Sequence, residues 1–204
     1  MRLIFTFLLG LVLLALPASA TITILAFGDS LSAGYGLEAG HAMPDVLQAT
    51  LQKDGKDVKI INGGVSGDTA AQGAARLDWA LTPEVRAIIL ELGANDALRG
   101  LPPEQTDQAL RQVMDKAKAK NLPVLILGMK APPNLGEDYR SKFDAIYPKL
   151  AADYGALFYP FYLDGVAAQP ELNQQDGMHP NDKGVALIVP KLLPFVEQLV
   201  TKLP

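Results

Sequence analysis

The sequence contains no cysteine, and this absence excludes several kinds of site. A chain of 204 residues without Cys has no disulfide, no thiol nucleophile, no zinc site built on thiolates and no lipid attached to an N-terminal Cys. The length fits one domain, whose hydrophobic core is large enough to be stable without cross-links.

Histidine and positive charge are also scarce. The chain has 2 His, 18 Lys and Arg, and 22 Asp and Glu, so its formal net charge is -4. Because no basic run is present, nucleic acid is not an expected partner. Two histidines without clustered ligands make a metal site unexpected. A dinucleotide-like string from Gly34 to Ala39 begins too far after the preceding strand, so we expect no cofactor. The oligomeric state is left open.

The first 20 residues have the pattern of a secretory signal peptide. Arg2 is followed by an apolar run over residues 3–16, then by Pro17 and the small residues Ala18-Ser19-Ala20. The run of about 14 residues is short for a membrane-spanning helix, which needs about 20. We therefore expect cleavage after residue 20, a domain over 21–204, export to the periplasm or the medium, and no stable membrane anchor after cleavage.

The rest of the chain alternates between strand and helix patterns. Short apolar runs predict strands at 21–27, 58–61, 85–92, 124–128 and 156–159. Apolar residues at i, i+3 and i+4 spacing predict helices around 43–51, 110–117, 143–154 and 185–200. Pro190 predicts a kink or a late start of the last helix. The alternation predicts a flavodoxin-like three-layer α/β/α sandwich around a five-stranded parallel sheet.

Polar clusters follow the predicted strands. The clusters are Gly28-Asp29-Ser30, Ser66-Gly67-Asp68, Asn95-Asp96 and Asp176-Gly177-Met178-His179. Each cluster alone is ordinary turn, cap or loop ion-pair chemistry. Parallel sheets bind ligands beyond the carboxyl ends of their strands, so we expect the four clusters to meet at one edge.

A serine hydrolase needs a base, and the two histidines differ in their neighbours. His41 precedes a predicted helix and is interpreted as a solvated residue. His179 has Asp176 three residues upstream, a spacing that lets the carboxylate reach the imidazole. Asp29, beside Ser30, is the alternative acid. We favour Asp176 because neighbouring side chains at a strand end tend to point apart, and Asp29 is expected to bond local backbone.

The four clusters, in this order, resemble the four sequence blocks of the SGNH, or GDSL, hydrolases over essentially the whole mature chain. The likeness is greatest to small exported bacterial enzymes with arylesterase, thioesterase and lysophospholipase activity. This resemblance implies a Ser30 nucleophile, a His179 base oriented by Asp176, and an oxyanion hole made by Ser30, Gly67 and Asn95. The implied substrate is a small acyl ester or thioester.

Several apolar residues follow these clusters and are expected to wall an acyl groove. They are Tyr35, Leu98, Met129, Pro132 and Met178. Each of them alone fits an ordinary surface loop equally well. Two alternatives to this function remain, a carbohydrate acetylesterase and a non-catalytic acyl- or glycan-binding module on the same fold.

Overall fold

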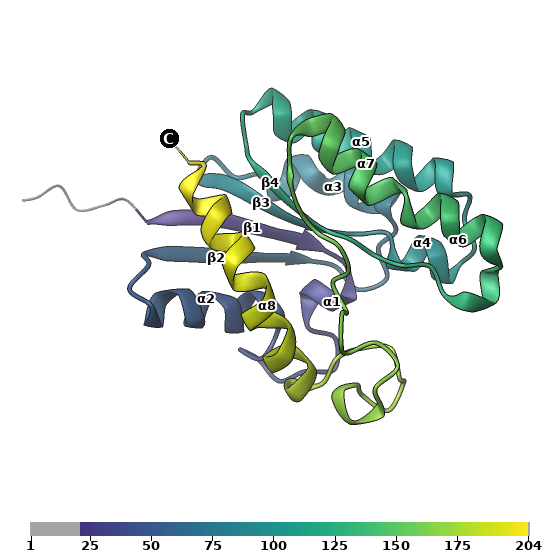
Figure 1. The fold of residues 1–204 in the computed structure, drawn as a ribbon. Coiled ribbons are helices and arrows are strands. Elements are labelled where there is room, and N and C mark those ends of the chain that lie inside the picture. Colours follow the sequence, from purple (N-terminus) through teal and green to yellow (C-terminus); the bar gives the residue numbers. More distant parts are fainter. Residues whose placement is uncertain (1–20, 204) are drawn as a thin grey trace, which may run out of the picture.

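Five parallel strands form the centre of the molecule, as the sequence predicts (Figure 1). The computed structural model describes residues 21–203, and the expected signal peptide lies outside them. The strands are β1 (Ile22–Gly28), β2 (Val58–Gly64), β3 (Val85–Glu91), β4 (Val124–Leu127) and β5 (Leu157–Tyr159). Their order, β2-β1-β3-β4-β5, is that of flavodoxin-like sheets.

Helices cover both faces of this sheet. The described helices are α1 (Ser30–Ala33), α2 (Met43–Lys53), α3 (Ala70–Ala80), α4 (Ala94–Leu98), α5 (Pro103–Ala119), α6 (Glu137–Asp144), α7 (Ile146–Tyr154) and α8 (Asp182–Thr201), with short 3-10 turns η1 (Pro133–Leu135) and η2 (Pro170–Leu172). One face carries α2 and α8, and the other carries α3, α5 and α7 (Figure 1). The three-layer prediction is therefore confirmed.

The last helix, α8, begins well before Pro190 and does not have the late start that was one of the two expectations. The side chain of Asn181 caps α8 by accepting hydrogen bonds from the backbone N–H groups of Lys183 and Gly184. The helix continues through Pro190 and Pro194, so the expected late start is wrong. By length and composition α8 is apolar enough to cross a membrane, but its apolar side packs on α2, β4 and β5. It is a core helix of the fold.

Two other helical features differ from the sequence pattern. The apolar stripe over 143–154 is divided between α6 and α7, which meet at Ala145. The division lies three residues before Pro148, which has no N–H to donate to the carbonyl of Asp144. Helix α3 was not predicted, because its apolar residues are mostly alanines. Thr69 and Gln72 form a capping box at its start, a signal that the sequence does carry.

Strand register brings the polar clusters to one level of the sheet. Gly28, the last residue of β1, pairs with Gly64 of β2 on one side and with Glu91 of β3 on the other. The segments that follow these three strands therefore leave the sheet side by side. They carry Ser30, Gly67 and Asn95.

Candidate active site

Three side chains from distant parts of the sequence meet at this edge. The Nε2 atom of His179 lies 2.9 Å from the Oγ atom of Ser30, and its Nδ1 atom lies 2.6 Å from Oδ2 of Asp176. A neutral imidazole carries one N–H. The carboxylate takes that N–H at Nδ1, so Nε2 remains as the acceptor for the Ser30 hydroxyl. The arrangement is chemically able to move a proton from Ser30 to His179.

Asp176 is held as an anion by its own loop. Its Oδ1 atom accepts hydrogen bonds from the backbone N–H groups of Met178 at 2.9 Å and His179 at 3.0 Å. Partial burial raises the pKa of Asp176, but these bonds and the His179 ring outweigh it, and the pKa falls from 3.8 to about 2. The carboxylate is therefore charged at neutral pH and able to stabilise an imidazolium.

Ser30 is the first residue of α1, and Gly67 lies in the loop after β2. Gly67 has a φ of 88°, a conformation that favours glycine, and its carbonyl accepts a hydrogen bond from Arg99 at 2.8 Å. Within the part of the chain that the structure describes, neither the Ser30 N–H nor the Gly67 N–H donates to another protein group. Two backbone donors beside the Ser30 side chain are thus open to a ligand.

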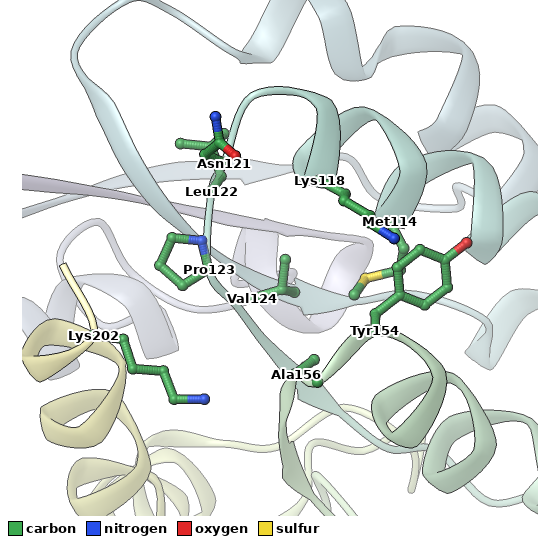
Figure 2. A pocket seen from close by; sticks show the side chains of 10 residues that line it. Met114, Lys118, Asn121, Leu122, Pro123, Val124, Tyr154, Ala156 and Lys202 are labelled. Carbon is green, nitrogen blue, oxygen red and sulfur yellow. The ribbon is translucent and has the colours of Figure 1, made fainter. Parts of the chain in front are cut away.

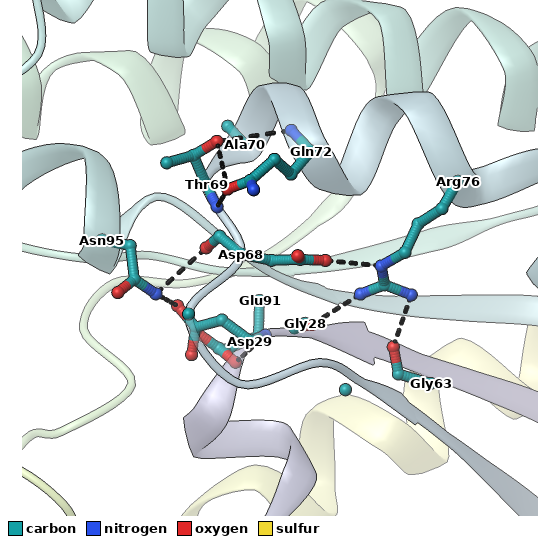
Figure 3. A network of polar contacts seen from close by, with 12 residues as sticks. Gly28, Asp29, Gly63, Asp68, Thr69, Ala70, Gln72, Arg76, Glu91 and Asn95 are labelled. Carbon is teal, nitrogen blue, oxygen red and sulfur yellow. Dashed lines mark hydrogen bonds and ion pairs between the residues drawn. The ribbon is translucent and has the colours of Figure 1, made fainter.

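The third candidate donor, the side-chain amide of Asn95, already has acceptors within the protein. Its Nδ2 atom lies 3.1 Å from Oδ2 of Asp29 and 3.0 Å from the carbonyl oxygen of Asp68 (Figure 3). An amide group has two N–H donors, and two acceptors are already in place for them. An oxyanion at this site therefore has to take the place of one acceptor.

A largely apolar hollow of about 580 Å³ adjoins Ser30 and His179. Its walls include all five residues expected from the sequence, namely Tyr35, Leu98, Met129, Pro132 and Met178. The Tyr35 ring also packs against the imidazole, with 4.8 Å between the ring centroids of Tyr35 and His179. Lys130 and Arg140 bring positive charge to the walls, and none of the described lining residues is acidic.

The other polar residues considered from the sequence, His41, Asp29 and Asp96, form no hydrogen bond with Ser30 Oγ or the His179 ring. Nδ1 of His41 lies 2.9 Å from Oδ1 of Asp182, so His41 is exposed but paired rather than free in solvent. Asp29 does not contact the His179 ring through a hydrogen bond; its Oδ1 atom accepts from the Leu31 N–H at 3.0 Å and caps α1. Asp96 accepts from the Ala70 N–H at 2.8 Å, a structural role at the start of α3.

Two residues that sequence reasoning missed support the loops of the site. The Arg76 guanidinium bonds the carboxylate of Asp68 and donates to the carbonyls of Gly63 and Gly28, each at 2.9 Å (Figure 3). It thereby joins the ends of β1 and β2 to the residue that follows Gly67. Glu91, at the end of the apolar strand β3, is fully buried. An acid ending a buried strand is the signal that could have found it.

One further stretch was missed. Phe161, Leu163 and Ala167, which follow β5, also line the hollow, and the sequence pattern of that segment carries no periodicity. A separate hollow of about 460 Å³ lies at the other end of the sheet, near Pro123, Val124 and Lys118 (Figure 2). It contains no acid and no histidine, and Ser30 is not among its lining residues. Among residues 21–203 no group of three or more His, Cys, Asp or Glu is placed to hold a metal ion.

Comparison with known proteins decides the family. Residues 26–187 match the GDSL-like Lipase/Acylhydrolase family. The chain belongs to this family. The resemblance inferred from the four sequence blocks is confirmed, and the protein is a carboxylic ester hydrolase of the GDSL, or SGNH, type.

Relatives with descriptive names cover most of the chain. It is 43% identical over 174 residues to thioesterase 1/protease 1/lysophospholipase L1 of Escherichia coli, covering 85% of this chain and 82% of that protein. It is 38% identical to an arylesterase of Vibrio mimicus, over 96% of this chain and 98% of that one. The solved structure of esterase EstA from Pseudoalteromonas sp., inhibited by monoethylphosphonate, has a TM-score of 0.83 at 32% identity, covering 88% of this chain and 98% of EstA.

Proposed function

We propose that this GDSL hydrolase cleaves acyl esters and thioesters through an acyl-enzyme formed on Ser30. The observation that carries the proposal is the chain of two contacts from Ser30 Oγ to His179 Nε2 and from His179 Nδ1 to Asp176. The names of the relatives, thioesterase, lysophospholipase and arylesterase, support the substrate class. A phosphonate-inhibited esterase with the same fold supports attack by a serine.

In the first half of the proposed reaction, Ser30 Oγ attacks the acyl carbonyl and its proton passes to His179 Nε2. Asp176 stabilises the imidazolium, which then gives the proton to the departing alcohol or thiol. In the second half, a water molecule gives a proton to His179 and attacks the acyl carbonyl. The acid is released and the proton returns to Ser30.

The negative oxygen of each tetrahedral intermediate needs donors that are already in place. We propose the backbone N–H groups of Ser30 and Gly67 and the side-chain amide of Asn95. The first two are free of other protein acceptors. The Asn95 amide joins by exchanging the Asp68 carbonyl for the oxyanion, because a neutral carbonyl is a weaker acceptor than the Asp29 carboxylate that takes the other N–H.

The adjoining hollow favours an acyl group longer than acetyl. Its walls are mostly apolar, and side chains as large as Phe161 and Met129 contribute to them. Burying each added CH₂ of a substrate is worth about 0.8 kcal/mol. We therefore place acyl esters ahead of carbohydrate acetyl groups. A chain-length series of p-nitrophenyl esters, measured beside an acyl-CoA and a lysophospholipid, gives the acyl and leaving-group preferences.

A fluorophosphonate probe and intact-protein mass spectrometry test the nucleophile. The protein should gain one probe mass, peptide mapping should place it on Ser30, and Ser30→Ala should gain none. Labelling that persists in Ser30→Ala would overturn the assignment. A protein that binds acyl chains but takes no label would favour the non-catalytic alternative.

We also propose that the protein is exported and that its first 20 residues are removed. The support is the charged, apolar and small-residue order of that segment, which is typical of signal peptides. Expression in a Gram-negative host followed by mass spectrometry of the periplasmic fraction should find a chain that begins at Thr21. A chain that retains Met1 and stays with the membranes would contradict this.

A further inference from the structure

Two carboxyl groups lie buried beside the proposed nucleophile. Asp29 and Glu91 are both fully buried. The Asp29 N–H and the Ser32 hydroxyl donate to Oε2 of Glu91 at 3.2 Å and 2.8 Å. Gly28 leaves the space that these groups need, because a Cβ atom there would collide with Oε2 of Glu91 and the Ser32 hydroxyl. Neither acid takes up or gives a proton in the reaction steps above.

The two acids differ in how readily they lose a proton. Burial raises the pKa of Glu91 well above its ordinary value, and the nearby charge of Asp29 raises it further. Burial also raises the pKa of Asp29 to about 6, while hydrogen bonds from the Leu31 N–H and Asn95 oppose the rise. Of the two acids, Asp29 therefore loses its proton more readily, and with a pKa of about 6 it is an anion at pH 8. The charge of His179 lowers the pKa of Asp29, and the charge of Asp29 in turn raises the pKa of the buried Tyr147 and Tyr162 hydroxyls.

The Asp29 carboxylate contacts two parts of the proposed machinery at once. Its Oδ1 atom accepts from the Leu31 N–H and so caps the helix that begins at Ser30. Its Oδ2 atom accepts from the Asn95 amide at 3.1 Å (Figure 3). One side chain thus connects the turn of the nucleophile, after β1, to the third oxyanion donor, after β3.

We propose that Asp29 is a positioning residue, whose carboxylate fixes the Asn95 amide relative to Ser30. The inference rests on the oxyanion role proposed for Asn95. When the oxyanion forms, Asn95 releases the Asp68 carbonyl, but the charged Asp29 keeps its N–H and holds the amide plane in place. Because this alignment matters in the transition state, its loss lowers kcat more than it changes KM.

The variant Asp29→Asn breaks the contact with Asn95 and keeps the cap of α1. Asn caps a helix about as well as Asp, so the amide oxygen can still accept from the Leu31 N–H. Its NH₂ group then faces the NH₂ group of Asn95, donor against donor. Since losing an oxyanion donor costs about 100- to 1000-fold, we expect misalignment to lower kcat about 10- to 100-fold, with KM within about threefold.

Asp96→Asn is the matched control. Asp96 is an almost fully buried acid next to Asn95 in the sequence. Its carboxylate accepts hydrogen bonds from the Ala70 N–H and the Thr106 hydroxyl, not from Asn95. We expect its kcat to stay within about threefold of the wild-type value. Asp29→Ser is a second test variant, because Ser retains a capping oxygen yet is too short to reach Asn95; it should lose kcat as Asp29→Asn does. Circular dichroism and thermal melts verify that each variant is folded.

A double-mutant cycle separates positioning from a general structural effect. Asn95→Ala alone should lower kcat about 100- to 1000-fold, and adding Asp29→Asn to it should lower kcat by less than about threefold. Wild-type kcat in folded Asp29→Asn, or a full additive loss in the Asn95→Ala background, would overturn the inference. If Asn95→Ala keeps wild-type kcat while Ser30→Ala is inactive, the inference fails and the proposed hydrolase function stands.

Discussion

Two aspartates, Asp176 and Asp29, lie close to the Ser30–His179 pair, and their surroundings shift their pKa values in opposite directions. Asp176 is partly exposed and accepts hydrogen bonds from two backbone N–H groups and from the His179 ring, so its pKa falls to about 2. Asp29 is fully buried beside Glu91, and its pKa rises to about 6.

The difference shows that closeness to Ser30 in the sequence does not decide which groups an acid contacts. Asp29 is the neighbour of Ser30 in sequence, but its oxygens are taken by Leu31 and Asn95. Asp176 is far away in sequence, but its loop places a permanent anion against Nδ1 of His179. We infer that Asp176 serves the base and Asp29 serves the oxyanion hole.

The largest expected effect comes from removing the proposed base, His179. His179→Gln should lower kcat by about 10⁴-fold or more, since single losses in a triad are of this size. The matched control is His41→Gln, because His41 is exposed and pairs with Asp182. Steady-state hydrolysis of a p-nitrophenyl ester measures both. A His179→Gln enzyme with a tenth of wild-type activity would rule out a histidine base.

The pH dependence of kcat/KM sharpens the comparison further. Asp29, whose pKa is raised to about 6, holds Asn95 most firmly as an anion, so kcat/KM should fall on acidification from pH 8 to pH 5. Asp176, with its pKa lowered to about 2, stays charged over that range. A flat profile between pH 5 and pH 8 would contradict the account.

Stability should respond to pH in opposite senses at the two aspartates. The folded-state pKa of Asp29 is raised, so its contribution to stability is fully present below pH 3.8 and is lost as the pH rises through about 6. The rise in the pKa of Asp29 from 3.8 to about 6 corresponds to about 3 kcal/mol of stability, at 1.36 kcal/mol per pKa unit. The lowered pKa of Asp176 gives a contribution that is present above pH 3.8 and lost as the pH falls through about 2.

Asp29→Asn isolates the first of these contributions. Removing the buried charge should make the variant more stable relative to wild type at pH 8 than at pH 4, by about 5 to 10 °C in Tm. Thermal melts of both proteins at the two pH values measure this. An equal Tm difference at pH 4 and pH 8 would show that Asp29 does not titrate in the folded protein as described.

The smallest expected effect concerns the wall of the hollow. Leu98 is 55% exposed and lines the hollow, so Leu98→Ala should lower kcat/KM about 3- to 10-fold for a long-chain ester and little for an acetyl ester. Leu187→Ala is the control, because Leu187 is exposed on α8 and does not line that hollow. Equal losses for both chain lengths would remove Leu98 from the acyl groove.

The sequence predicted the sheet and the polar clusters because both depend on local patterns. Apolar runs ending in Gly, Asp, Ser or Asn indicate strands followed by functional loops, and parallel topology brings those loops together. The missed features depend on contacts between segments. Nothing near Arg76 indicates that it joins the ends of β1 and β2, and the occupied amide of Asn95 follows from Asp29 and Asp68 meeting it in space. Alanine-rich α3 lacked the strong apolar stripe by which the other helices were found.

The most direct test of the two assigned roles is kcat for Asp176→Asn and Asp29→Asn, measured side by side on one ester at pH 8. We predict a loss of about 10³- to 10⁴-fold for Asp176→Asn, because the imidazole loses the anion that fixes its tautomer. For Asp29→Asn we predict the smaller loss, about 10- to 100-fold, that misalignment of one oxyanion donor brings. The reverse order, with Asp176→Asn close to wild type and Asp29→Asn nearly inactive, would contradict the account and assign Asp29 as the acid that serves His179.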